Sequence, residues 1–181
     1  MHTPRLGVEE RWRRDIRKWR PLAARGDGMA IHNIAVAYRV LGRARLSAQW
    51  FKKAAMTGDG DAMVDYAYYL QHGAGVRRDL AQAEEIYRRV IEFDYVTEAS
   101  REEARYLLSV ILLRDKSDSS RGEAVKLLEA ATADGDYPVA QRFLEDVASG
   151  TEGAACTCRR YLRPGLARRH CPLHRPTTGS G

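Results

Sequence analysis

The residues with the strongest chemical signal lie near the C-terminus, where all three cysteines of the 181-residue chain occur. Cys156 and Cys158 are separated by one residue, and Cys171 and His174 are separated by two. Thiolate sulfur and imidazole nitrogen are preferred zinc ligands, and a structural zinc site needs four ligands in a tetrahedral arrangement. The segment therefore predicts a structural zinc site formed by these four residues, with His170 as an alternative fourth ligand.

Other interpretations of this segment stay open. The cysteines could be free thiols in a tail without a fold, redox-reactive thiols, or partners in a disulfide, which a cytoplasmic location disfavours. With zinc bound, the segment is expected to form a small structural unit, because zinc supplies folding free energy that a short segment lacks. Its arginines could instead contact nucleic-acid phosphates. They are Arg159, Arg160, Arg163, Arg168, Arg169 and Arg175. Tyr161 is the one aromatic residue available to stack on a base, so we do not expect sequence-specific binding.

No other set of residues has the pattern of a catalytic site. His32 and His72 are far apart in sequence, and neither has an evident carboxylate and nucleophile to act with. The acidic pair Glu84 and Glu85 is adjacent, so its carboxylates point to different sides of a helix. The sequence therefore predicts a protein that is not an enzyme.

Residues 66–91 form the clearest structural unit in the sequence. Tyr66 and Leu70 have helical spacing, and Gly73 and Gly75 follow them. Glycine can adopt the left-handed backbone conformation that ends a helix. Asp79 is a good N-cap for a second amphipathic segment. A connection this short predicts two antiparallel helices.

Weaker copies of this unit lie on both sides of it. Residues 50–62 match residues 86–94 with a shift of 36, and residues 127–139 match residues 50–62 with a shift of 77. A period in this range is typical of helical repeat arrays. The turn HGAGVRRD (72–79) and the helix WFKKAAMTG (50–58) resemble the Sel-one-like repeat, a subclass of tetratricopeptide-like repeats. This resemblance covers about residues 22–148 and implies an all-α, right-handed superhelix with adaptor roles in complex assembly or signalling.

The chain divides into three predicted parts. Residues 1–27 are expected to form a capping helix. Residues 28–149 are expected to form about three helix-pair repeats and a closing half-repeat at 138–148. Residues 150–181 are expected to form a basic linker and tail. The apolar face of the opening helix, expected at residues 9–25, covers the end of the stack, and Pro21 suggests a kink or break in it. An alternative function for that helix is a basic arm for an acidic partner. Its charges are Arg11, Arg13, Arg14, Arg17 and Arg20.

The resemblance also implies a binding surface, since the first helix of each pair usually lines the concave side of such a stack. The groove is then expected to include Asn33, Asp65, Tyr68, Tyr69, His72 and Arg114. For Tyr68 and Tyr69, packing between neighbouring helices is the competing interpretation.

Charge separates the middle of the chain from its ends. Residues 1–25 carry eight Lys or Arg against three acidic residues, and residues 151–181 carry six against one. Residues 26–150 carry sixteen basic and twenty acidic residues. The start lacks an apolar signal segment, and no apolar run is long enough to span a membrane, so a cytoplasmic protein is expected. The sequence thus favours a protein-interaction scaffold with a zinc tail, and the alternative is a nucleic-acid-associated regulatory factor that uses the basic tail.

Overall fold

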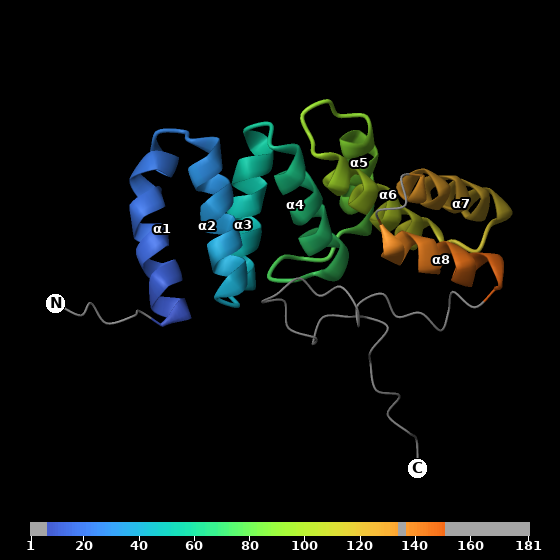
Figure 1. Cartoon of the computed structure of the whole chain (residues 1–181), viewed down its shortest axis with the longest axis horizontal. Helices are drawn as coiled ribbons and strands as arrows, with labels where there is room; N and C mark the ends of the chain where they lie inside the picture. The colour runs from blue at the N-terminus through green and yellow to red at the C-terminus, as the bar shows by residue number, and fades with distance from the viewer. Residues whose placement is uncertain (1–6, 134–136, 151–181) are drawn as a thin grey trace, which may run out of the picture.

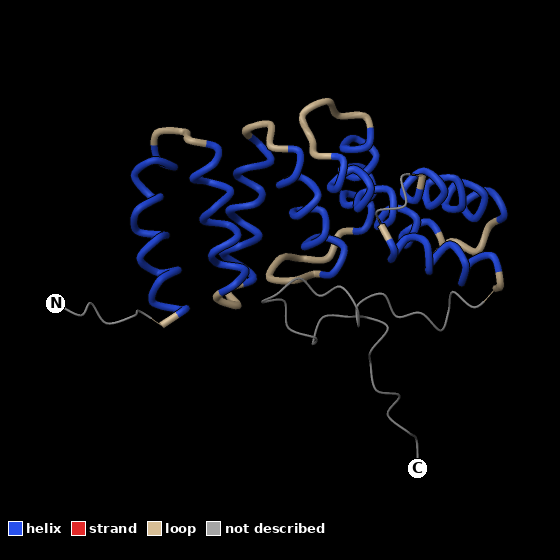
Figure 2. The backbone as a smooth tube through the Cα atoms, viewed as in Figure 1, coloured by secondary structure: helices blue, strands red, loops and turns tan. Residues whose placement is uncertain are grey.

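The computed structural model describes residues 7–133 and 137–150, and within these ranges it consists of α-helices joined by turns, without a strand (Figure 2). Eight helices are present in this part of the chain. They are α1 (Val8–Ala24), α2 (Gly28–Val40), α3 (Ala44–Met56), α4 (Gly60–His72), α5 (Leu80–Ile91), α6 (Glu98–Leu112), α7 (Asp118–Thr132) and α8 (Pro138–Ala148).

The helices follow one another in chain order along the long axis of the molecule, from α1 at one end to α7 and α8 at the other (Figure 1). Each helix packs against the helices before and after it, and α4 also contacts α6. The prediction of an all-helical array of consecutively packed helices is therefore confirmed. None of the helices described is long and apolar enough to cross a membrane.

Small side chains allow the helices of the array to approach closely. Alanine is fully buried at many positions along it, where a larger side chain would hold neighbouring helices apart. These alanines are Ala35, Ala37, Ala48, Ala54, Ala62, Ala67, Ala83, Ala104, Ala124, Ala131 and Ala140. Fully buried Phe51, Tyr69 and Tyr87 fill the wider spaces between helices.

The hydroxyls of the fully buried Tyr69 and Tyr87 are both hydrogen-bonded. Tyr69 donates to Ser47 Oγ at 2.8 Å, and Ser47 Oγ donates in turn to the carbonyl of Ala35 at 2.8 Å. Tyr87 donates to Gln71 Oε1 at 2.9 Å. These bonds offset the cost of removing the hydroxyls from water and fix α3 and α5 to their neighbours.

Five of the eight described helices begin with a side-chain cap. Asp27, Asp59 and Asp79 each accept a hydrogen bond at 2.9 Å from the backbone N–H three residues later. The predicted cap at Asp79 is thus confirmed. Thr97 and Ser117 cap α6 and α7 in the same way.

The turn between α4 and α5 has the left-handed backbone expected of its glycines. Gly73 has φ +66° and Gly75 has φ +73°. A Cβ atom at Gly75 would lie 2.6 Å from Arg45 Cα and would overlap the backbone of Ala44, so this turn lies directly against the start of α3. Gly75 is therefore required both by its φ angle and by this close approach.

The break suggested for Pro21 is not present, because α1 is continuous as far as Ala24. Pro21 lies in the last turn of the helix. The proline there removes one hydrogen bond, to the carbonyl of Arg17, and little helix follows that could be displaced.

Candidate binding surfaces

Three residues of the predicted groove, Asp65, Tyr68 and His72, share one face of α4, at spacings of three and four residues. Asp65 is almost fully buried and accepts a hydrogen bond from Arg39 Nη1 of α2 at 2.8 Å. The rings of Tyr68 and His72 are in contact, with centroids 4.3 Å apart and their planes tilted by 41°. Burial, with a smaller contribution from the charge of Arg78, lowers the pKa of His72 to about 4. His72 is therefore neutral at pH 7.

The other residues of the predicted groove lie in different environments. Tyr69 has no exposed surface and belongs to the core, Asn33 is half-buried on α2, and Arg114 is exposed just after α6. Burial and then the charge of Arg114 lower the pKa of Arg78. The binding role expected for this set remains a prediction.

His32 connects α2 to the start of α4. Its Nδ1 lies 2.7 Å from Oδ2 of Asp59, the N-cap of α4, and its ring meets the ring of Phe51 edge-on, with centroids 5.7 Å apart. The hydrogen bond to Asp59, opposed by burial, raises the pKa of His32. Burial raises the pKa of Asp59, but the bonds from His32 and from the backbone N–H of Ala62 outweigh it and lower that pKa overall. The pair is thus a charge-assisted contact between α2 and α4.

A groove that the sequence did not predict lies on a different face of α4, around Tyr66. Two adjoining hollows of about 260 and 740 Å³ both include Tyr66 and Gln82 in their walls. We call them together the Tyr66 groove. Its walls are formed by Lys52, Ala55, Met56, Met63, Tyr66, Leu70, Val76, Arg77, Arg78, Asp79, Leu80, Gln82, Glu85, Ile86 and Arg89.

Tyr66 itself is half-buried between these hollows. Within the described residues its hydroxyl makes no hydrogen bond. Burial, with a contribution from the charge of Asp79, raises the pKa of this hydroxyl. In the sequence, Tyr66 looks like part of the apolar stripe of α4. The one sequence signal that could have indicated the groove is that this apolar stripe carries a tyrosine, whose hydroxyl needs a hydrogen-bond partner or solvent.

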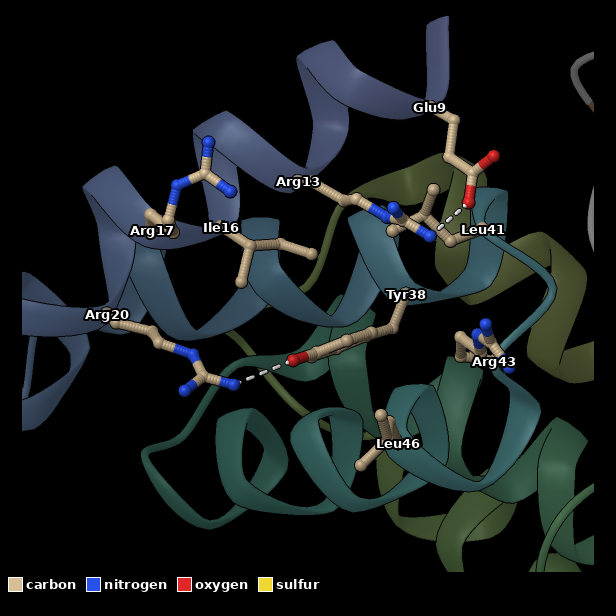
Figure 3. Close-up of a pocket in the computed structure, with 9 residues that line it drawn as sticks. All are labelled: Glu9, Arg13, Ile16, Arg17, Arg20, Tyr38, Leu41, Arg43 and Leu46. Atoms are coloured by element: carbon tan, nitrogen blue, oxygen red, sulfur yellow. Dashed lines mark hydrogen bonds and ion pairs between the residues drawn. The ribbon is translucent and has the colours of Figure 1, made fainter.

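A separate hollow, the α1–α3 cleft, has a volume of about 360 Å³. It is lined by Glu9, Arg13, Ile16, Arg17 and Arg20 of α1, Tyr38 and Leu41 at the end of α2, and Arg43 and Leu46 at the start of α3. Figure 3 shows the ring of Tyr38 lying along this cleft, with Ile16 on one side and Leu46 on the other. The guanidinium of Arg20 is at the hydroxyl end of that ring, and Arg43 is at the opposite end.

The arginines of the α1–α3 cleft differ in their partners. Arg13 forms an ion pair with Glu9 at 2.6 Å, and Arg20 donates to the hydroxyl of Tyr38 at 3.0 Å. Arg17 and Arg43 are exposed, and their guanidinium groups have neither a hydrogen bond nor an ion pair with any other described residue. The cleft therefore has an excess of positive charge. The sequence predicted part of this set as a basic arm but did not place Arg43 beside it.

The predicted zinc ligands Cys156, Cys158, Cys171 and His174 lie outside the described residues, as do the tail arginines expected to contact phosphates. Within residues 7–133 and 137–150 there is no group of three or more His, Cys, Asp or Glu side chains placed to hold a metal ion. The zinc site and the nucleic-acid alternative both stay predictions.

Comparison with known proteins gives no family assignment: no protein-family model, curated protein or solved structure matches the chain.

Proposed function

We propose that this protein is a non-catalytic scaffold that binds a peptide segment of a partner protein in the Tyr66 groove. In this proposal the helices form a short right-handed superhelix of Sel-one-like repeats. The helical array and the residues that resemble this repeat, above all the turn at residues 72–79, support the proposal. Arrays of this kind provide extended binding surfaces without reactive groups.

The observation that carries the proposal is the continuity of the Tyr66 groove across three helices. Its apolar walls include Met63 and Ile86, and the shared residue Tyr66 lies where the two hollows meet. Pockets that hold ligands are mostly apolar with a few polar groups that fix orientation. Here the hydroxyl of Tyr66 and the charges of Glu85 and Arg89 are such groups. Tyrosine is among the residues that most often dominate binding free energy.

The test compares Tyr66→Ala with Tyr95→Ala. Tyr95 is 81% exposed and lies outside the Tyr66 groove, so it is a matched tyrosine without the proposed role. Proteins that the wild-type chain captures from lysate are identified, and each is purified and titrated against the three proteins. For a true partner, Tyr66→Ala weakens binding by about 2 kcal/mol, or roughly thirtyfold, and Tyr95→Ala leaves it unchanged.

Tyr66→Phe is the control for a loss of binding caused by unfolding, because it keeps the packed ring and removes only the hydroxyl. Wild-type thermal stability with binding weakened several-fold is expected for this variant. If every purified partner bound Tyr66→Ala and Tyr95→Ala equally well, the Tyr66 groove would not be the binding surface and the proposal would fail.

A further inference from the structure

The α1–α3 cleft combines an apolar floor with cations that have no acidic partner. Ile16 and Tyr38 form the buried part of the floor, and Leu46 at its edge is 39% exposed. An exposed leucine is unremarkable by itself. Here it lies beside two arginines whose charges nothing in the described part of the chain neutralises, so the same small region has both apolar and electrostatic binding capacity.

The cations are distributed along the cleft rather than collected at one point. Arg43 is at one end of the Tyr38 ring, and Arg20 is at the other, as Figure 3 shows. Arg17 adds a charge on the α1 side. The one acidic residue of the lining, Glu9, is already paired with Arg13. A ligand that is negatively charged at both ends and apolar in the middle therefore matches the cleft.

We infer that the α1–α3 cleft is a second binding site, and that it takes an acidic segment of a partner protein in which carboxylates flank an apolar side chain. The apolar side chain packs against Ile16 and Leu46, beside the Tyr38 ring. The carboxylates pair with Arg43 at one end of the cleft and with Arg17 on its α1 side. Arginine suits this role because its planar guanidinium can pair with a carboxylate through two parallel hydrogen bonds.

The size of the cleft favours this occupant over a nucleic acid. Its volume of about 360 Å³ is at the lower end of the range for ligand pockets and suits one or two side chains. Tyr38 is only 9% exposed and its hydroxyl accepts a hydrogen bond from Arg20, so too little of its ring is open for a base to stack on. The site goes beyond the proposed function, since it is separate from the Tyr66 groove and shares no residue with it.

The experiment measures binding of a fluorescein-labelled peptide, Glu-Glu-Leu-Glu-Glu, to the full chain by fluorescence anisotropy at low ionic strength. Two further peptides carry Gln in place of every Glu, or Ser in place of Leu. The acidic leucine peptide is expected to bind most tightly, and added salt is expected to weaken it. The double variant Arg17→Gln/Arg43→Gln should weaken binding of this peptide at least about tenfold.

A matched double variant controls for net charge. Lys126→Gln/Arg142→Gln removes two positive charges from exposed positions on α7 and α8, and it should change binding of the peptide by less than about twofold. Leu46→Glu is a second, independent variant at an exposed position. It places a carboxylate in the cleft and should abolish binding of the acidic peptide while the melting temperature stays near that of the wild type.

Three results would overturn the inference. The first is equal weakening by the two double variants, which would mean that the peptide responds to net charge alone. The second is equal binding of the leucine and serine peptides, which would mean that the apolar floor is not used. The third is displacement of the peptide by a short single-stranded oligonucleotide at a lower concentration than by unlabelled peptide, which would assign the cleft to nucleic acid. Because no variant alters the Tyr66 groove, none of these results bears on the proposed function.

Discussion

Replacing Gly75 with alanine tests the contact between the α4–α5 turn and α3. Gly75 has φ +73°, and Gly42, which is also left-handed at φ +68°, has no atom within 4 Å of an added Cβ. Gly42→Ala therefore measures the conformational cost alone. That cost is about 1 kcal/mol, because the strain of a left-handed alanine is partly offset by the lower entropy of the unfolded chain.

Gly75→Ala adds a steric cost to this conformational cost. The new Cβ would lie 2.6 Å from Arg45 Cα, well inside the 3.5–4.0 Å at which two carbon atoms attract most strongly. The obstructing atoms are backbone, so the turn or the start of α3 must move, at a further cost of about 1–3 kcal/mol. We therefore expect a total of about 2–4 kcal/mol for Gly75→Ala, at least about 1 kcal/mol more than for Gly42→Ala.

Urea unfolding followed by circular dichroism at 222 nm measures both variants at one pH and temperature. A lower midpoint with an unchanged slope indicates a loss of native-state stability rather than a change in the unfolded state. If Gly75→Ala is no more destabilised than Gly42→Ala, the turn does not lie against the start of α3, and the argument from close approach is wrong.

Three further outcomes are expected. The pKa of His32 is raised chiefly by its bond to Asp59, so the stability from this pair is complete just below pH 6.5, where Asp59 is still ionised, and is lost as pH rises through the raised pKa. The unfolding free energies of wild type and His32→Gln should differ by on the order of 1 kcal/mol at pH 6 and converge at alkaline pH. Asp65→Asn removes the charge that balances Arg39, whose side chain is 15% exposed, and should cost about 3 kcal/mol in urea unfolding, a loss that Arg39→Met in the same chain should partly restore. Protein purified without chelator should contain one zinc per chain by mass spectrometry, and Cys171→Ser should lose it; absence of zinc from the wild type would refute the four-ligand site.

Local signals in the sequence were sufficient to predict several of the helices. The Asp79 cap, the glycines at 73 and 75 and the apolar spacing around Leu70 depend only on neighbouring residues, and the structure has them as expected. The closing helix was predicted at residues 138–148, which are the bounds of α8.

The positions of the surface hollows could not be predicted in the same way. Arg43 and Arg17 are 26 positions apart in sequence, and they line one cleft only because α1 and α3 both lie beside the end of α2. Tyr66 and Tyr69 are both aromatic residues of α4, yet one borders a groove and the other is in the core. Which side of a helix stays open depends on how its neighbours cross it, and a single sequence does not specify those angles.

The helix caps have a consequence for the way the array unfolds. Asp59 caps α4 and also bonds His32 of α2, while Thr97 caps α6 and donates through its N–H and hydroxyl to Asp61 of α4, at 3.0 and 2.8 Å. The start of α4 is thus stabilised by α2, and the start of α6 by α4, so each bond joins one helix pair (α2–α3, α4–α5 or α6–α7) to the next. Loss of one pair weakens the nucleation of the next, which makes unfolding of adjacent pairs cooperative, as in a chain of nearest-neighbour units. Hydrogen exchange should therefore detect α2, α4 and α6 opening together, although each belongs to a different helix pair.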